Sequence, residues 1–319
     1  MASSLDIKRR IRSINSTRKI TKAMEMVSAA KMRRAVASVL GIRAYAHAAW
    51  SVLTNLARAF ESSENYGFLE VREVKSVLMI AITSNRGLCG SFNTQVAKKI
   101  KEEILHPEKL KINRIGKKKI ESKIKNEDLK VDFIVVGKKG GNIVRKMQKE
   151  IIAAFPDGGK FATVVDIKPL SKIVMDDYLA KKYDKVVMIY TDYISAVNQQ
   201  TRIRQVLPIS KIDIEKQIAE MDVIAKEYGL EEPVVEYKIE PSASEVLEFI
   251  IPRLIEMQLF HGVLESQASE QSARMMAMRN ATDAAKEMSD DLTLAYNQIR
   301  QGKITQEIAE ISAGRAALE

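Results

Sequence analysis

The most constraining feature of this 319-residue sequence is where its prolines lie: none precedes Pro107 and none follows Pro252. Proline disrupts a helix interior because it lacks a backbone N–H donor and clashes with the preceding turn. Both ends of the chain are therefore free to form long helices. A helix over residues 253–318 would be roughly 100 Å long at 1.5 Å per residue, far longer than most helices of globular proteins.

Apolar residues near the C-terminus recur at alternating intervals of four and three, which is typical of a coiled coil. Eight of the eleven residues at these intervals are apolar; the series is Leu264, Ala268, Gln271, Met275, Met278, Thr282, Ala285, Ser289, Leu292, Tyr296 and Ile299. The N-terminal segment shows the same intervals only in three blocks that are out of phase, beginning at Ile7, Ile20 and Met32. We expect the two terminal helices to pair in antiparallel fashion, with methionines in the shared seam.

The middle of the chain alternates strand-like and helix-like segments, which favours a mostly parallel sheet in a Rossmann-like α/β domain. Strands are predicted at 76–83, 131–136, 185–190 and 202–209, and helices at 93–105, 141–149, 168–182 and 211–229. The predicted fold class is thus α/β, a long antiparallel coiled coil with an inserted domain. Its expected parts are an N-terminal helix (1–60), the α/β domain (75–210), a connecting segment (211–245) and a C-terminal helix (246–319).

A glycine loop, T-S-N-R-G-L-C-G-S-F-N, follows the first predicted strand and occupies residues 83–93. Strand, glycine loop and helix is a layout that can bind phosphate at the helix N-terminus. However, Gly87 and Gly90 are too close for a Walker motif, and Ser91-Phe92 stand where Lys and Ser or Thr are needed. We expect Gly87, Cys89 and Gly90 to form a structural turn, with Cys89 as a small packed thiol.

Charge and composition limit the partners and the kinds of site that this chain can have. Residues 1–45 carry eleven Lys and Arg against two acids, which suits an acidic partner, nucleic acid or anionic lipid. No uncharged apolar run reaches the length of a membrane span, and no signal peptide is apparent. The three histidines have no His or Cys neighbours at ligand spacing, so we expect no metal site. No group of residues suggests a catalytic site, and we expect neither catalytic residues nor a cofactor.

The two ends of the chain resemble a known family. S-T-R-K-I-T-K-A-M-E-M-V-S-A-A-K-M-R-R (16–34) closely resembles the N-terminal signature of the gamma subunit of F-type ATP synthases. R-G-L-C-G (86–90) is similar to a segment of the same family. E-S-Q-A-S-E-Q-S-A-R-M-M-A-M-R-N-A-T-D (265–283) and Y-N-Q-I-R-Q-G-K-I-T-Q-E-I-A-E-I-S-A-G (296–314) resemble its C-terminal helix. The motifs occur in the family's order and span the chain.

This resemblance implies a non-catalytic central rotor shaft of bacterial type, which couples proton flow to ATP synthesis or hydrolysis and regulates both. The implied partners are the alpha and beta subunits of the catalytic ring, the epsilon subunit and the membrane c-ring, without nucleic acid or bilayer insertion. The implied location is peripheral, at the cytoplasmic face of the bacterial plasma membrane. Matching positions imply contacts with the catalytic ring at Met24, Glu270, Arg274, Arg300, Gln301, Thr305, Glu307 and Glu310, and basic contacts lower on the shaft at Arg9 and Arg10.

Two alternatives to a rotor shaft follow from the residues alone. A basic coiled-coil protein would bind nucleic acid through residues 8–34, with affinity that falls as salt rises. A Rossmann-type enzyme would bind a nucleotide at residues 85–92. Neither alternative explains the C-terminal motifs.

Overall fold

The computed structural model describes residues 4–59, 67–70, 72–115, 118–122, 124–156, 162–209 and 243–316. The chain divides into two compact units, which we describe separately. The helical unit combines Met1–Ala30 with Arg274–Glu319, and the α/β unit is Lys31–Ala273. The helix expected at 211–229 lies outside the described residues. The expected domain boundaries therefore stay predictions.

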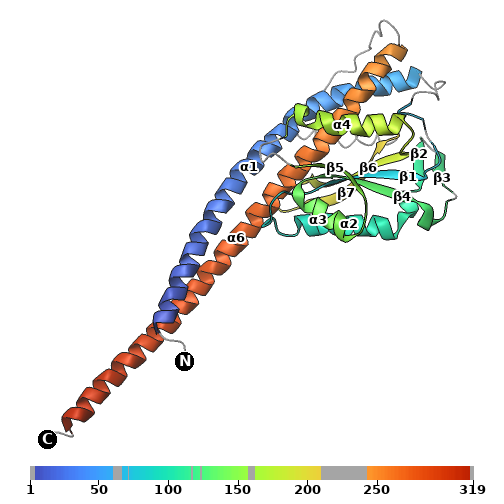
Figure 1. Cartoon of the computed structure of the whole chain (residues 1–319). Coiled ribbons are helices and arrows are strands. Elements are labelled where there is room, and N and C mark those ends of the chain that lie inside the picture. The colour runs from blue at the N-terminus through green and yellow to red at the C-terminus, as the bar shows by residue number, and fades with distance from the viewer. Residues whose placement is uncertain are drawn as a thin grey trace. The chain divides into compact units, whose positions relative to one another are not determined.

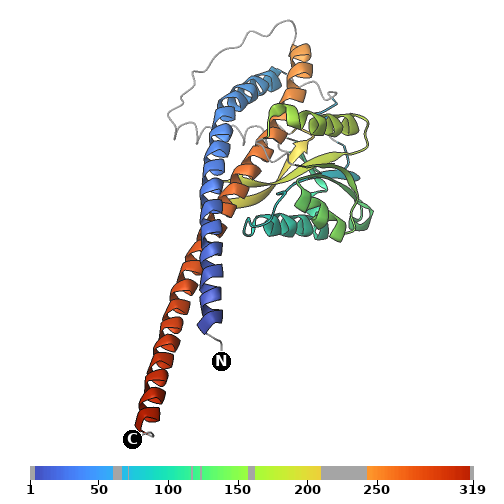
Figure 2. The same ribbon diagram turned by 60° about the vertical axis from the view of Figure 1, so that its left-hand side comes forward.

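Two helices account for both ends of the chain (Figure 1). Helix α1 runs from Ser4 to Ala59 and helix α6 from Ala243 to Ala316. Within the helical unit their segments lie side by side and run in opposite directions in both views (Figures 1 and 2). The antiparallel pairing expected from the sequence is therefore confirmed within this unit.

The seam between these helices in the helical unit follows the expected C-terminal series. The residues of α6 at four-three intervals from Met278 to Ile299 are buried or half-buried, whereas their outer neighbours Asp290, Asp291 and Leu294 are exposed. On α1 the covered stripe is equally regular, although the apolar pattern is broken into blocks. It comprises Ile7, Ile11, Ile14, Arg18, Thr21, Glu25 and Ser28.

The α/β unit contains a five-stranded sheet in the order β5-β4-β1-β6-β7. The pairs β1–β4, β1–β6 and β4–β5 are parallel, and β6–β7 is antiparallel. A separate antiparallel hairpin contains β2 and β3. The elements between α1 and α6 are β1 (Ser76–Ile82), α2 (Phe92–Leu105), η1 (Pro107–Lys109), β2 (Ile112–Ile115), β3 (Lys118–Glu121), η2 (Asn126–Asp128), β4 (Lys130–Val136), α3 (Lys138–Lys146), β5 (Ile151–Phe155), α4 (Val164–Leu179), β6 (Lys185–Tyr193) and β7 (Gln199–Leu207).

Both faces of the sheet are covered, so the central strands are apolar almost throughout, as expected for parallel strands. Alternate residues of β1 point to opposite faces. Leu78 and Ile80 pack in the core shared with α4 and α6, whereas Val77 and Met79 pack in the core shared with α2 and α3. Figure 2 shows α4 on one side of the sheet and α2 with α3 on the other. The predicted Rossmann-like domain is confirmed.

Helix α4 begins earlier than predicted because its first turn is stabilised by polar groups rather than by an apolar pattern. Thr163 and Asp166 form a capping box in which the Asp166 carboxylate accepts hydrogen bonds from the Thr163 backbone N–H at 2.8 Å and its hydroxyl at 2.7 Å. The sequence predicted that this helix would begin at Lys168, one residue before Pro169. In the structure the helix begins at Val164, and Pro169 lies inside it.

Candidate functional site

The glycine loop connects β1 to α2 and is held together by its own polar side chains. The Asn93 amide accepts a hydrogen bond from the Ser84 backbone N–H at 3.1 Å and donates to the Ser84 hydroxyl at 2.7 Å. The same amide nitrogen lies 3.2 Å from the sulfur of Cys89, which is only 2% exposed. Gly90 has a φ of +57°, in the left-handed region that glycine adopts without strain. These contacts agree with a turn that serves the fold.

The neighbouring helix N-terminus, that of α3, has its first amides occupied by the chain itself. The backbone N–H of Lys138 donates to the Asn85 side chain at 3.0 Å, and that of Lys139 donates to the Ser84 carbonyl at 3.1 Å. The N–H of Gly140 donates to the Thr83 hydroxyl at 2.8 Å. A phosphate at a helix N-terminus needs such donors to be available. In α3 they tie the loops after β1 and β4 together.

A polar face of α6 lies against the β6–β7 hairpin. The Ser266 hydroxyl accepts a hydrogen bond from the Thr191 backbone N–H at 3.0 Å, and the Ser269 hydroxyl donates to the Thr191 carbonyl at 3.1 Å. The Glu265 carboxylate accepts from the Tyr193 N–H at 2.8 Å. Glu265, Ser266 and Ser269 are each at most 2% exposed. Helix side chains therefore satisfy buried backbone groups of a strand.

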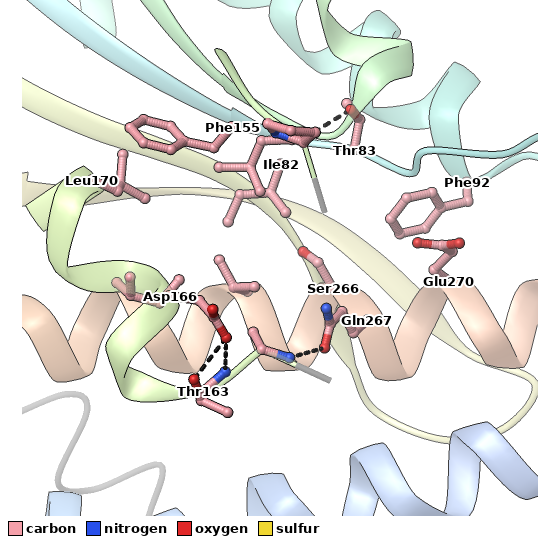
Figure 3. Close-up of a pocket in the computed structure, with 15 residues that line it drawn as sticks. Ile82, Thr83, Phe92, Phe155, Thr163, Asp166, Leu170, Ser266, Gln267 and Glu270 are labelled. Carbon is pink, nitrogen blue, oxygen red and sulfur yellow. Dashed lines mark hydrogen bonds between the residues drawn. The ribbon is translucent and has the colours of Figure 1, made fainter. Parts of the chain in front are cut away.

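A cavity of about 450 Å³ lies beside this part of α6 (Figure 3). Its walls are the carboxyl ends of β1, β4 and β5, the first turns of α4 and the α6 residues from Val263 to Glu270. Most of its lining is apolar, including Ile82, Phe155 and Leu170, which Figure 3 shows together on one side. Gln267 reaches across from α6, and its side-chain oxygen accepts a hydrogen bond from the Ala162 N–H at 3.2 Å.

The residues expected to contact a catalytic ring, and the two arginines expected lower on the shaft, differ in burial. Arg300, Gln301, Thr305, Glu307 and Glu310 are all exposed on the last turns of α6, and Arg9 and Arg10 are exposed on the first turns of α1. Met24 is half-buried. Glu270 and Arg274, in contrast, are only 7% and 8% exposed. Glu270 lines the cavity, where Figure 3 shows its carboxylate near Phe92.

The polar face of α6 is the feature that the sequence interpretation missed. Its residues belong to the E-S-Q-A-S-E-Q-S stretch, in which the sequence pattern pointed only to Ala268 and Gln271 as seam positions and to Glu270 as a contact with other subunits. A signal was present, because Gly262, Glu265, Ser269 and Ser272 recur at intervals of three and four. Small or polar residues at such intervals indicate a helix face that approaches another backbone closely.

Within the described part of the chain, no cluster of three or more His, Cys, Asp or Glu residues is arranged to hold a metal ion. Among these residues there is also no helix with a stretch apolar and long enough for a membrane crossing.

Comparisons with known proteins agree with these features. The ATP synthase family model matches residues 3–318. The ATP synthase gamma chain of Roseiflexus castenholzii is 38% identical over 319 residues, covering all of this chain and 99% of that protein. The gamma chain of Heliobacterium modesticaldum is 39% identical over 313 residues and 98% of each chain.

Solved structures share the fold at low sequence identity. The rotor of Euglena gracilis mitochondrial ATP synthase, in rotational state 1, is similar with a TM-score of 0.58 and 17% identity, over 94% of this chain and 98% of that chain. A chain of the OSCP/F1/c-ring structure from the same organism gives a TM-score of 0.62 and 18% identity, over 99% and 94% of the two chains. From the family match and the full-length relatives, this chain belongs to the family of ATP synthase gamma chains.

Proposed function

We propose that this chain is the central rotor shaft of an F-type ATP synthase. The observation that carries the proposal is the full-length similarity to bacterial ATP synthase gamma chains, with neither chain extending far beyond the other. The relatives named as rotor components share its fold of paired terminal helices and an inserted α/β domain. The basic N-terminal helix, which alone suggested nucleic-acid binding, is part of this family pattern.

The mechanism requires a shaft whose outer surface differs from one side to the other. In the helical unit the seam contains both apolar and polar residues, while further apolar side chains point outward. Ile20, Met26 and Val27 on α1 are 57%, 58% and 56% exposed. Exposed apolar groups of this kind mark contact surfaces. As the shaft turns, unequal contacts with each catalytic subunit bias its conformational populations, and thereby its nucleotide affinity.

The end of α6 presents a second apolar stripe. Ile304, Ile308 and Ile311 recur at intervals of four and three and are 48%, 59% and 73% exposed. They share these turns with Arg300, Gln301, Thr305, Glu307 and Glu310, which we assign to contacts with the ring of alpha and beta subunits. We assign Arg9 and Arg10 to basic contacts lower on the shaft, and Met24, Glu270 and Arg274 to the transmission of those contacts into the helices.

The chain contributes no catalytic group in this proposal. The loop of Gly87, Cys89 and Gly90 is a structural turn in this proposal, and the Lys138 and Gly140 amides at the start of the nearby helix α3 have partners within the chain. Besides the alpha and beta subunits, the proposed partners of the chain are the epsilon subunit and the membrane c-ring. We place the chain at the cytoplasmic face of the bacterial plasma membrane as a peripheral subunit, where it transmits and regulates proton-driven ATP synthesis.

The test is reconstitution with the cognate alpha and beta subunits, followed by observation of a bead on the α/β unit during ATP hydrolysis. Cys89 is buried, so a biotin–maleimide would label an introduced Lys101→Cys, at an exposed position of α2, in preference. We expect one copy per ring and ATP-dependent rotation in one direction. A ring without nucleotide is the control. A folded chain that does not join the ring, or joins without rotating, would overturn the proposal.

A truncation gives a second test of the shaft role. Removal of residues 1–34 together with the last two turns of α6 should weaken both torque and assembly. Undiminished coupled ATP synthesis after this double truncation would contradict the shaft role. The alternative function, nucleic-acid binding through residues 8–34, is tested by titrating the chain with nucleic acid at several salt concentrations.

A further inference from the structure

One face of α6 carries residues suited to hold the sheet rather than to fill a core. Gln258, Gly262, Glu265, Ser269 and Ser272 recur at alternating intervals of four and three, so they share one helix face. An added Cβ at Gly262 would lie 2.4 Å from the Met188 side chain. The absence of a side chain at this position therefore allows α6 to approach β6 closely.

The polar residues of this face take the place of a missing strand. The register of β1 with β6 ends at Ala81 opposite Ile189. Beyond that point the N–H and C=O of Thr191 are bound by Ser266 and Ser269, and the N–H of Tyr193 is bound by Glu265. Strand β6 thus continues past its neighbour because helix side chains complete its hydrogen bonding.

The same face also holds the loop and the far end of the hairpin. The Ser272 hydroxyl donates to the Ala196 carbonyl at 2.6 Å and lies 3.3 Å from the Gln199 amide nitrogen, which donates to it. Four turns earlier, the Gln258 amide donates to the Gln205 carbonyl at 3.2 Å. The hydrogen bonds to the β6–β7 hairpin therefore extend from Gln258 to Ser272 on α6.

The neighbouring side of α6 meets the sheet mainly through apolar side chains, with Val263 in one core with Ile82 and Val136. Val263 and Glu270 also line the cavity with the ends of β1, β4 and β5, and Gln267 accepts a hydrogen bond from the Ala162 N–H there. Apolar contacts are not directional, whereas hydrogen bonds weaken steeply when their angle changes. The bonds to the β6–β7 hairpin are consequently the contacts best able to resist twisting of α6 against the sheet.

We propose that Glu265, Ser266, Ser269 and Ser272 form the joint through which torque passes between α6 and the sheet of the α/β unit. The inference rests on the proposed rotor function and assigns to positioning residues a role within it. Helix α6 is continuous from Ala243 to Ala316, so force applied to its exposed last turns reaches this joint along one helix. The joint then keeps the α/β unit turning in phase with the helix.

The test variant is Ser266→Ala/Ser269→Ala/Ser272→Ala, labelled at Lys101→Cys and assembled into the ring. The ring is stalled with a non-hydrolysable ATP analogue, and the angular fluctuation of the bead is recorded. Because each removed bond is buried and directional, we expect the variance of the bead angle to rise roughly two-fold or more. Hydrogen exchange at the Thr191 amide should accelerate in the same variant, because that amide loses its acceptor Ser266. Exchange at the Tyr193 amide should accelerate in Glu265→Leu.

Matched variants separate this joint from general loss of stability. Ser38→Ala removes an exposed hydroxyl that bonds only to the Arg34 carbonyl of its own helix, and should leave the variance unchanged. Glu265→Gln keeps an acceptor for the Tyr193 N–H, whereas Glu265→Leu removes it. We expect Glu265→Gln to resemble the unmodified chain and Glu265→Leu to broaden the angle. If the triple variant does not assemble into the ring, the comparison of Glu265→Gln with Glu265→Leu tests the proposed joint.

An unchanged variance of the bead angle in both the triple variant and Glu265→Leu would overturn the proposal of a joint. Broadening without faster exchange at Thr191 in the triple variant, or at Tyr193 in Glu265→Leu, would also overturn it, because the compliance would then lie elsewhere. Failure of the rotor function is distinguishable, since in that case the unmodified chain itself would not rotate.

Discussion

The Thr282 hydroxyl of α6 lies 2.8 Å from the Thr21 hydroxyl of α1, in the seam of the helical unit. The Thr21 hydroxyl is also 3.1 Å from the Arg18 carbonyl, to which it donates. The Thr282 hydroxyl is also 2.8 Å from the Met278 carbonyl of its own helix, so its one proton has two possible acceptors. Thr21 is 8% exposed, so this pair is a polar contact within an otherwise covered seam. Such a pair can fix the register of two helices.

We predict that Thr282→Val and Thr21→Val each cost about 1 kcal/mol of stability, because each removes the hydrogen bond between the two helices. In each variant the remaining hydroxyl keeps a carbonyl of its own helix as a partner, Arg18 for Thr21 and Met278 for Thr282. The double variant should cost less than the sum, since two apolar side chains of the same shape can pack together. A coupling energy of roughly 0.5–1.5 kcal/mol is expected from a double-mutant cycle. Urea unfolding of the isolated chain, followed by helical circular dichroism, measures it.

Thr293→Val is the control for this cycle. The Thr293 hydroxyl bonds the Ser289 carbonyl of its own helix, and the residue is exposed. Its substitution should change stability by no more than about 0.5 kcal/mol. Strictly additive effects of Thr21→Val and Thr282→Val would show that the two hydroxyls do not stabilise the seam jointly.

The same seam shows where sequence patterns suffice and where they fail. The C-terminal series was recognisable because most of its residues are apolar. On α1 the seam passes through Arg18, Thr21, Glu25 and Ser28, while Ile20 and Val27 point outward. A hydrophobic pattern therefore breaks into blocks that are out of phase, although the helix packs regularly. Apolar residues that serve an external surface are indistinguishable by pattern from those in a seam.

Strand prediction succeeded where burial is complete. Strands β1, β4 and β6 are apolar because both sheet faces are covered, and their positions were recognised within a few residues. Strand β5 is a half-buried edge strand and was missed, as was the short β2–β3 hairpin. The α6 joint was missed for a different reason. In the sequence its serines look like ordinary surface residues of a helix. Only the structure shows that the end of β6 lies opposite them.

The glycines near the sheet edge should differ sharply in their tolerance of alanine. Gly87 has open space around its Cβ position, so Gly87→Ala should change stability by less than about 0.5 kcal/mol. Gly90→Ala should cost about 1–2 kcal/mol because of its positive φ. Gly137→Ala should cost more, since its Cβ would lie 2.1 Å from the Thr83 carbonyl oxygen. Urea unfolding of the three variants tests this order, and equal costs would contradict it.

Buried tyrosines should make the fold sensitive to alkali. Burial raises the pKa of Tyr178 to about 12, although the nearby Arg72 opposes this shift. Burial likewise raises the pKa of Tyr183, whose hydroxyl donates to Asp132, and the pKa of Tyr190. An unfolded tyrosine has a pKa of about 10, so the stabilisation is complete below pH 10 and is lost as pH rises toward the folded value.

For Tyr178 this loss amounts to about 2–3 kcal/mol between pH 10 and 12. Tyr178→Phe should lower stability at pH 8, because the hydroxyl donates to the Glu70 carbonyl at 2.8 Å. The same variant should lose less stability than the unmodified chain between pH 10 and 12. Urea unfolding at several pH values measures both effects. Equal losses over that pH range would show that Tyr178 does not contribute to the alkaline sensitivity.

The last turns of α6 offer the clearest separation of partner contact from folding. Arg300 and Glu307 are exposed and two turns apart, so they lie on nearly the same helix face. Arg300→Ala and Glu307→Ala should therefore alter the stability of the isolated chain by no more than about 0.5 kcal/mol. If both side chains contact the catalytic ring, ATP synthesis by the reconstituted complex should fall, by roughly three-fold to ten-fold per lost charged contact.

Gln298→Ala is a matched control for this pair, because Gln298 is exposed on the same helix but was not assigned a contact. It should leave both stability and ATP synthesis unchanged. The charge-reversed double variant Arg300→Glu/Glu307→Arg should reduce ATP synthesis more strongly than either alanine variant, since it places like charges against the same partner groups. Normal ATP synthesis in that double variant would remove Arg300 and Glu307 from the set of ring contacts. The exposed apolar stripe of Ile304, Ile308 and Ile311 would then be the surface to test on this end of the helix.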